Sequence, residues 1–386
     1  AFVAAQKRIE GLARHKGTLG RDAATMLAAY RDISDTMKDA YRVYQFAALK
    51  RDEDQRVPEA QARFGRVQAL LAGLGENTSW ISPELLAIGP EKIEGFLKAE
   101  KRLEPFSYQL RDAVRMAPHT LDDQGEAMLA GAALALGQPQ QIYALYTNAS
   151  IPWPTVKLSD GSELKVDQSG YARGRQAADR ADRKLVFDTF WGAWKQYENG
   201  MGATLNAQVQ GAVFNARARK FDGVLEAAMF SNALPPQVYT QLVDQVNAGL
   251  PTFHRYLKLR GRMLGLSELR YYDIYPPIIS ANTGVFDLAR SSEITFAALE
   301  PFGDEYLGML RSGLASKWMH SHPQEGKQSG AYMAGSAYDV HPYLLLNHND
   351  DYESMSTFAH EWGHAVHTLL ANKAQPFEKA SYSTFI

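Results

Sequence analysis

The chain of 386 residues is 45% hydrophobic and 22% charged, which is typical of a globular protein with two or three domains or one large body with a cleft. Its net charge of −2 gives no basis for binding nucleic acid or an anionic membrane surface, and the absence of cysteine excludes disulfides and thiolate metal ligands. The longest apolar stretch, around 127–136, is far shorter than the roughly 20 residues of a membrane span, and no signal peptide is visible.

The first part of the chain has a helical pattern, and we assign 1–150 to an N-terminal helical domain. Met26, Leu27, Tyr30 and Ile33 recur at three- and four-residue spacing, which is the period of an amphipathic helix. Further helices are expected from four start signals: Pro58, Pro83, Pro90, and Asp122 or Asp123, the last helix running to Leu136.

The second part opens with the clearest strand signal of the chain. Apolar and polar residues alternate over 155–166 around an Asp-Gly turn, which predicts a β-hairpin. Helices are expected to resume after Asp179 and again over 235–263, before an extended segment at 271–279.

Two polar segments of this part are interpreted as structural. The basic run Arg173, Arg175, Arg180 and Arg183 is expected to form a solvated face or ion pairs. The glycine-bearing segment 326–335 is not a P-loop, because the pattern needs Ser or Thr after its Gly-Lys pair. We expect it to be a loop whose backbone approaches another group closely.

A short strand is predicted directly after this loop. The run 341–347 is apolar and bears Pro342 at its edge. A strand that leads into the next helix could bind an extended peptide by adding it as another strand.

The next helix carries a metal-binding motif. His360-Glu361-Trp362-Gly363-His364 is an H-E-x-x-H sequence, and residues four apart lie on one face of a helix. Two imidazoles so placed can bind one Zn²⁺ at about 2.0–2.1 Å. Glu361 is offset by one residue, which suits a general base that acts on water beside the metal.

The residues around the motif predict the helix and its ends. Apolar residues from Met355 to Leu370 form one stripe, and Asp350 with Glu353 resembles a capping box at the start. Asn372 and Pro376 mark the stop. Gly363 inside the helix costs about 1 kcal/mol relative to Ala, and close approach of a backbone or a ligand would explain it.

A zinc site needs a third protein ligand, and the sequence offers little choice. Glu378 is the only acidic residue after His364, in a segment that is equally suited to an exposed turn. His367 lies about 10 Å along the helix from His360, so we expect it in the cleft or in a supporting position rather than on the same ion.

Four other histidines lie nearby in the sequence. His320 and His322 are expected in a solvated loop rather than in a metal site. His341 and His348 flank the predicted strand, and one of them could face the cleft.

These segments resemble the M3 (thimet oligopeptidase-like) zinc metallopeptidases, most closely the oligoendopeptidase F branch. The matching segments are Gly330 to Tyr332, Pro342 to Asn347, Phe358 to His367 and Asn372 to Pro376, and Tyr272 to Tyr275 and the N-terminal helices are also similar. The resemblance implies a mainly α fold: a large helical body with a deep substrate channel, a small β-hairpin and a short edge strand beside the motif helix. It also implies short peptides as substrates and one Zn²⁺ per complete site, with His360 and His364 as ligands and Glu361 as the base.

The resemblance also implies residues that this chain does not contain. The family takes its third ligand, a Glu, from a helix beyond the second His, and its oxyanion-stabilising His and Tyr lie further on. Because the chain stops at Ile386, we expect 151–386 to hold the hairpin and only the N-terminal part of the catalytic domain. A longer protein or a C-terminal polypeptide partner would complete the site, and an N-terminal Ala in place of Met suggests that something upstream was removed or not included.

Two alternatives to a zinc endopeptidase stay open at this point. One is a non-catalytic peptide-binding fragment with an incomplete metal site, and the other is a helical metallocarboxypeptidase with the same motif. In each case we expect a soluble protein in the cytoplasm or the periplasm, with no nucleic-acid or membrane partner.

Overall fold

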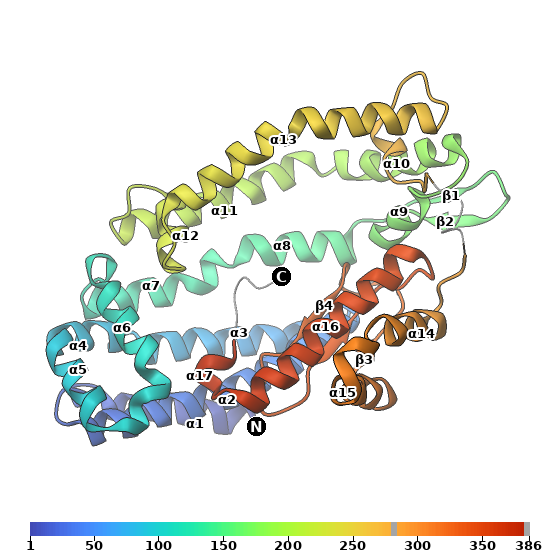
Figure 1. The fold of residues 1–386 in the computed structure, drawn as a ribbon. Coiled ribbons are helices and arrows are strands. Elements are labelled where there is room, and N and C mark those ends of the chain that lie inside the picture. The colour runs from blue at the N-terminus through green and yellow to red at the C-terminus, as the bar shows by residue number, and fades with distance from the viewer. Residues whose placement is uncertain (279–283, 382–386) are drawn as a thin grey trace.

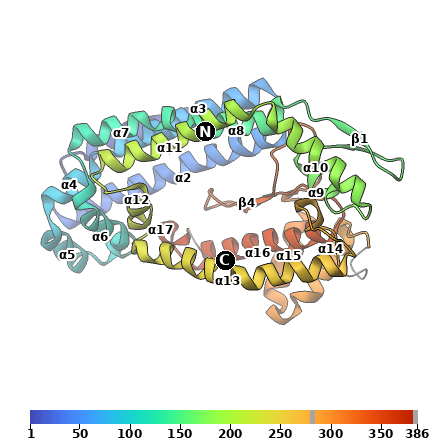
Figure 2. The same cartoon turned by 90° about the horizontal axis from the view of Figure 1, so that it is seen from above.

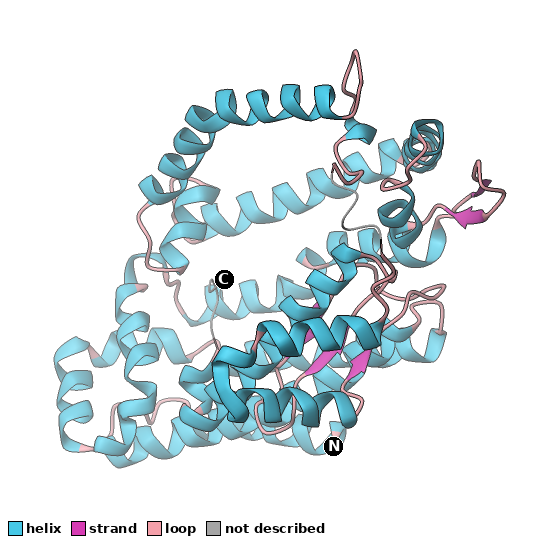
Figure 3. Ribbon diagram, turned by 45° about the vertical axis from the view of Figure 1, so that its right-hand side comes forward, coloured by secondary structure: helices cyan, strands magenta, loops and turns pink. Residues whose placement is uncertain are grey.

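The computed structural model describes residues 1–278 and 284–381, and helices make up most of these residues (Figure 1, Figure 3). The strands that accompany them are short and fall into a two-stranded and a three-stranded sheet. The prediction of a mainly α fold is confirmed. In the part of the chain that the structure describes, no helix is both long and apolar enough to cross a lipid bilayer.

The N-terminal part is a succession of α-helices and short 3₁₀ helices (η1, η2 and η3) that ends in one π-helical turn. Its elements are α1 (Phe2–Gly11), η1 (Leu12–His15), α2 (Ala23–Glu53), α3 (Pro58–Thr78), α4 (Ile81–Ile88), α5 (Pro90–Ala99), η2 (Lys101–Phe106), α6 (Ser107–Arg115), η3 (Ala117–His119), α7 (Asp123–Leu136), α8 (Gln138–Leu145) and the π-helix η4 (Tyr146–Ser150). Pro58 and Pro90 begin helices as predicted, and Asp122 caps α7 by accepting from the Gly125 N–H. Pro83 does not begin its helix, because α4 starts two residues earlier at Ile81.

The long helix α2 organises this part through its apolar stripe. Met26 and Leu27 are buried in a cluster with Leu103 and Leu110, which come from the helical turns that follow α5. One to two turns further along α2, Ile33 belongs to a second cluster with residues of α1 and α3. The predicted helical stripe is therefore the core of this part.

The middle part begins with the predicted hairpin. Strands β1 (Thr155–Lys157) and β2 (Glu163–Lys165) pair antiparallel with Val156 opposite Leu164. The elements that follow are α9 (Gln168–Gly174), α10 (Arg180–Lys195), α11 (Glu198–Ala218), α12 (Val224–Ser231), α13 (Pro236–Met263) and the 3₁₀ turn η5 (Tyr271–Asp273). Asp179 caps α10 and Pro236 begins α13, as predicted.

A buried carboxylate, Asp273, organises the basic run of this part. Arg180 and Arg183 pair with Asp273, whose side chain is fully buried, at 2.9 and 3.1 Å. Arg175 pairs with Glu353, so the ion-pair interpretation is confirmed for these three arginines. The extended segment predicted at 271–279 begins instead as the turn η5, because the Asp273 carboxylate accepts from the Arg270 N–H. Residue 279 lies outside the described residues.

The C-terminal part holds the three-stranded sheet and the motif helix. Its elements are α14 (Leu288–Ala298), η7 (Glu300–Phe302), α15 (Gly303–Ala315), β3 (Met319–His320), β4 (Tyr332–Ala334), β5 (Tyr343–Leu345), α16 (Tyr352–Ala374) and α17 (Phe377–Ala380). The strand order is β3-β5-β4, with β3 parallel and β4 antiparallel to β5. The strand predicted at 341–347 is therefore central, and the edge strand is β4, which the sequence analysis assigned to a loop.

The views in Figure 1 and Figure 2 place the long helices relative to one another. Viewed from above, α2, α3, α7 and α8 run along one long side of the molecule, and α13, α15 and α16 run along the other. In Figure 1, however, α13 lies at the top and α16 lower down, so the two helices are well separated. The short strand β4 lies against α16, which it contacts directly.

Candidate metal centre

The helix α16 is held rigidly by its apolar face. Phe358 and Trp362 are fully buried and pack with Leu310 of α15 and Leu344 of β5 in one cluster. The helix begins at an N-cap, Asp351, whose carboxylate accepts from the Ser354 N–H. The cap lies one residue after the predicted Asp350, because the backbone of Asp350 has a positive φ of 57° rather than the extended conformation of an N-cap.

Two glycines near the motif have different surroundings. An added Cβ at Gly313 of α15 would lie 2.6 Å from Trp362 and 2.8 Å from Trp318, so glycine is what lets α15 approach α16. At Gly363, inside the motif, an added Cβ would meet nothing within 4 Å. The backbone contact that was one explanation for Gly363 is therefore not found in the described residues.

The two motif histidines are brought together on the open side of α16. Their Nε2 atoms lie 3.0 Å apart, and their rings are 4.6 Å apart and nearly perpendicular. His360 is exposed and His364 is half-buried. Two nitrogens that share a tetrahedral Zn²⁺ at about 2.0–2.1 Å are separated by about 3.3 Å. The pair therefore fits two adjacent ligand positions of a zinc ion with a shift of a few tenths of an ångström.

Glu361 lies beside this pair in a different environment. Its side chain is buried, with 8% of its surface exposed. Burial raises the pKa of the Glu361 carboxyl, an effect that His360, His364 and the backbone N–H of Met333 reduce in that order. A carboxylate with a raised pKa binds a proton more readily than an exposed one, which is the property of a general base.

Glu361 and His364 line a cavity of about 740 Å³, which we call the α16 pocket. Its lining includes Glu361 and His364 on α16, Met333 on β4 and Glu378 on α17. The Glu378 carboxylate accepts from the Ser34 hydroxyl of α2, which holds it on the far wall. Within 1–278 and 284–381 no group of three or more His, Cys, Asp or Glu side chains is arranged to bind one metal ion. Glu378 is therefore not brought onto the His360–His364 pair as a third ligand.

Three of the other histidines, His341, His348 and His320, occupy structural positions. His341 stacks on Trp318 at 4.4 Å. His348 is buried, and its Nδ1 accepts from the Asp350 N–H while its Nε2 lies 3.2 Å from the Ser291 hydroxyl, which ties the start of α14 to the loop before α16. His320 is part of β3 rather than of a solvated loop, as its segment pairs with β5.

Two models of known protein families match this chain. The model of peptidase family M3 matches residues 175–386, and the model of oligopeptidase F matches 84–152. The chain belongs to peptidase family M3. This membership confirms the resemblance inferred from the sequence. Family M3 is a metallopeptidase family.

Three individual proteins are similar to most or all of this chain. The chain is 31% identical to oligopeptidase PepF of Bacillus subtilis over 100% of its length, and 30% identical to group B oligopeptidase PepB of Streptococcus agalactiae over 91%. The solved structure of oligoendopeptidase-F from Enterococcus faecium matches 82% of the chain with a TM-score of 0.71 and 28% identity. The chain covers 57%, 58% and 60% of these three proteins, respectively, and thus spans under two thirds of their length.

The edge strand β4 is the part of the site that the sequence analysis missed. Its residues, Tyr332 to Ala334, stand between Gly330 and Gly335, and such glycines favour a loop assignment. The available signal was the short apolar run between the two glycines, which is long enough for one three-residue strand but shows no alternation.

Proposed function

We propose that this chain is the zinc-binding part of an endopeptidase that hydrolyses short peptides, with His360 and His364 as zinc ligands and Glu361 as the general base. The observation that carries the proposal is the 3.0 Å separation of the two Nε2 atoms, together with the buried Glu361, which lines the α16 pocket beside His364. Membership in family M3 supports peptides as the substrate class.

The chain's own residues would act on the proton of the attacking water. Zinc at His360 and His364 would supply the Lewis acidity that polarises the scissile carbonyl and acidifies water. Glu361 accepts a proton from that water as its oxygen attacks the carbonyl carbon, and then gives the proton to the leaving amide nitrogen as the C–N bond breaks. Its raised pKa suits both transfers, since the proton must be held between the two steps.

The strand β4 is the element best placed to position the peptide. It pairs with β5 along one edge, and in the described residues no strand pairs with its other edge. An extended peptide can add to such an edge through main-chain hydrogen bonds. Met333 of β4 and Glu361 line the same pocket, so a peptide on β4 would run past the proposed base.

A further polypeptide is proposed to complete the site. No third ligand joins the His360–His364 pair in the residues described, and α13 exposes an apolar stripe along most of its length. The stripe consists of Val238, Tyr239, Leu242, Val243, Val246, Leu250, Phe253, Tyr256, Leu259 and Met263. A stripe of this size is normally covered, and the relatives of this chain contain additional polypeptide that can supply both the cover and the ligand. The missing ligand also favours one alternative, which is peptide binding without turnover.

The test is the substitution Glu361→Gln, assayed with an internally quenched oligopeptide in the presence of zinc. The amide keeps the size of the side chain but cannot accept the proton, so turnover is expected to fall by a factor of about 10²–10⁴ while zinc remains bound. Unchanged turnover in this variant would contradict the assignment of the base. A wild-type chain that binds the peptide without cutting it would support the binding alternative instead.

The same assay separates the endopeptidase from a metallocarboxypeptidase. Peptides with a free and with an amidated C-terminus are compared at the same length. An endopeptidase cuts both at similar rates, whereas cleavage restricted to the free acid would identify a carboxypeptidase.

A further inference from the structure

The strand β4 is held by elements from distant parts of the chain. One edge pairs with β5, and α16 contacts the strand, with the Thr368 hydroxyl 3.8 Å from Met333 Sδ. An added Cβ at Gly335 would lie 2.9 Å from the Thr368 side chain, so glycine lets the chain just after β4 approach α16 closely. Further contacts come from α2, which lies at least 280 residues earlier in the sequence.

Gln45 of α2 holds the C-terminal end of β4 with both ends of its side-chain amide. Its Nε2 donates to the Ala334 carbonyl oxygen at 3.3 Å, and its Oε1 accepts from the Ala337 N–H at 2.8 Å. Gln45 and Ala337 are each 3% exposed, so water does not replace these bonds. Loss of the amide would therefore leave a buried N–H without a partner, which is unfavourable unless the end of β4 shifts.

Asp52, also on α2, holds the N-terminal end of β4. Its Oδ2 accepts from the Tyr332 hydroxyl at 2.7 Å, and its Oδ1 accepts from Nε and Nη2 of Arg51 at 2.8 and 2.6 Å. Asp52 is 5% exposed. Burial, and after it the charge of Asp52, raises the pKa of the Tyr332 hydroxyl, so Tyr332 keeps the proton that it donates. The bond between Tyr332 and Asp52 is therefore a charge-assisted hydrogen bond.

The spacing of Gln45 and Asp52 on α2 matches the length of β4. Residues seven apart lie on the same face of a helix, and a rise of 1.5 Å per residue separates them by about 10 Å. A strand of three residues, such as β4, is also about 10 Å long. Because side chains alternate along a strand, holding Tyr332 against α2 turns Met333 toward α16, where it contacts Thr368.

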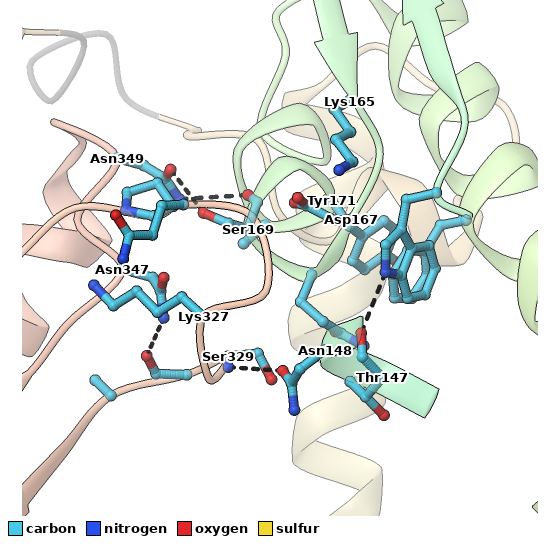
Figure 4. A pocket seen from close by; sticks show the side chains of 18 of the residues that line it. Thr147, Asn148, Lys165, Asp167, Ser169, Tyr171, Lys327, Ser329, Asn347 and Asn349 are labelled. Atoms are coloured by element: carbon cyan, nitrogen blue, oxygen red, sulfur yellow. Dashed lines mark hydrogen bonds between the residues drawn. The ribbon is translucent and has the colours of Figure 1, made fainter. Parts of the chain in front are cut away.

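The loop that leads into β4 is fixed as well. The Gln328 N–H donates to the Asp52 carbonyl oxygen at 2.9 Å. The Ser329 N–H donates to the Asn148 side-chain oxygen, also at 2.9 Å, and Figure 4 shows these two residues facing each other across this bond. With the loop, both ends and one edge held, β4 cannot shift along β5 without breaking several hydrogen bonds.

We propose that Gln45 and Asp52 are positioning residues of the peptidase, which hold the unpaired edge of β4 in place for the main chain of a bound peptide. The inference rests on the proposed function, in which a peptide adds to this edge. In the described part of the chain neither side chain lines the α16 pocket, so both act on the substrate through β4. Loss of both should weaken binding of the peptide main chain and leave zinc binding unchanged.

The test measures peptide binding in a Glu361→Gln background, which does not cut the peptide. A dye-labelled alanine-serine peptide of eight residues is compared with two copies that are N-methylated at alternate residues, one copy for each alternate set. Binding to the zinc-loaded chain is followed by fluorescence anisotropy. A peptide at a strand edge uses one alternate set of main-chain N–H groups, so one methylated copy is expected to bind about tenfold more weakly than the unmodified peptide.

Substitutions on α2 should remove this preference. In Gln45→Leu/Asp52→Ala the Kd of the unmodified peptide should rise about tenfold, and its advantage over the methylated copy should fall below about threefold. Tyr332→Phe, which removes one hydrogen bond and keeps the ring, should raise the Kd about threefold. Asp52→Asn keeps an acceptor for the Tyr332 hydroxyl and should bind the peptide like the background.

Two controls separate positioning from a loss of stability. Zinc affinity, measured by calorimetry, should be the same in every variant, because no proposed zinc ligand is changed. Asp273→Asn removes the charge partner of Arg180 and Arg183, and it should lower the melting temperature while leaving the Kd of the peptide unchanged.

Several results would overturn the positioning role. These are an unchanged Kd in both Tyr332→Phe and the double variant, an undiminished preference for the unmodified peptide, or a parallel loss of zinc affinity. Weaker binding in Tyr332→Phe but not in the double variant would also overturn it, since the hydroxyl would then act on the peptide directly. If the double variant does not fold, Tyr332→Phe and Asp52→Asn decide: weaker binding in the first alone supports the role, and equal binding in both overturns it.

Failure of this inference is distinguishable from failure of the proposed function. If the background binds all three peptides equally, no peptide main chain pairs with β4, and the positioning role falls while a peptidase function stands. If the background binds none of them, the proposed function is contradicted as well.

Discussion

The helices α13 and α16 have similar sequence patterns and opposite surroundings. Both are long, and both carry apolar residues at three- and four-residue spacing. On α16 the stripe is buried against α15 and β5, and Phe358 is fully inaccessible. On α13 only Arg260 and Gly261 are buried, and Phe253 is 52% exposed.

The difference shows how packing produces the candidate site. Because α16 is held along one whole face, the histidines on its other face keep a fixed separation, which a metal site needs. The helix α13 is held at its C-terminal end, where Arg260 donates to the carbonyl oxygens of Asp273 and Pro276. An amphipathic pattern therefore predicts that a helix forms, but not that its apolar face is covered within the same chain.

A matched pair of substitutions tests this comparison with the largest expected effect. Phe358→Ala on α16 should lower the free energy of unfolding by about 3–5 kcal/mol, because it leaves a cavity in a packed cluster. Phe253→Ala on α13 should change it by less than about 0.5 kcal/mol. Urea denaturation followed by circular dichroism gives both values. Equal losses would show that the α13 face is packed in the protein in solution.

The buried carboxylate of Asp273, which anchors η5 to α10, should give the next largest effect. Asp273→Asn leaves Arg180 and the buried Arg183 without their charge partner, and about 3 kcal/mol of stability should be lost at pH 7. Burial raises the pKa of the Asp273 carboxyl, but hydrogen bonds from Arg180, the Arg270 N–H and Arg183 outweigh this and lower it below 3.8.

The lowered pKa of Asp273 fixes the pH dependence of this effect. The folded protein favours the ionised form, so the stabilisation is complete above pH 3.8 and is lost as the pH falls through the lowered pKa. The difference between wild type and Asp273→Asn should therefore shrink only in strong acid. As a control, Asp188→Asn removes an exposed ion pair with Lys184 and should change the stability far less. A similar cost for both substitutions would refute the anchoring role of Asp273.

The smallest effect on stability is expected on the exposed face itself. Leu242→Glu/Val246→Glu on α13 should leave the melting temperature nearly unchanged, since neither side chain is packed in the described structure. The same variant should reduce self-association in sedimentation velocity, because it breaks a large apolar patch. A large drop in melting temperature would mean that this face is covered within the chain.

Much of the fold was predictable because its signals are local. The hairpin at 155–166, the helices that begin at Pro58, Pro90 and Pro236, and the helix of the motif all follow from turn, proline and periodicity signals. The pair His360 and His364 was predictable because four-residue spacing on a helix determines which side chains meet.

The features that were missed depend on long-range contacts. The strand β4 exists because it pairs with β5, and the Asn148–Ser329 and Ser169–Asn349 hydrogen bonds join segments more than 150 residues apart. The burial of Glu361 and the position of Glu378 on the far wall of the α16 pocket cannot be inferred from residue spacing, because each depends on a neighbouring element. The division of the chain into 1–150 and 151–386 stays a prediction.

Zinc titration by isothermal calorimetry tests the central claim most directly, since it measures the metal site without relying on turnover. Wild-type chain and Glu361→Gln should each bind one zinc ion. His360→Ala and His364→Ala should each bind it at least about tenfold more weakly, because each removes one of two ligands. His254→Ala, at an exposed histidine of α13, should behave as wild type. Zinc affinity that is unchanged in His360→Ala and His364→Ala would contradict the account.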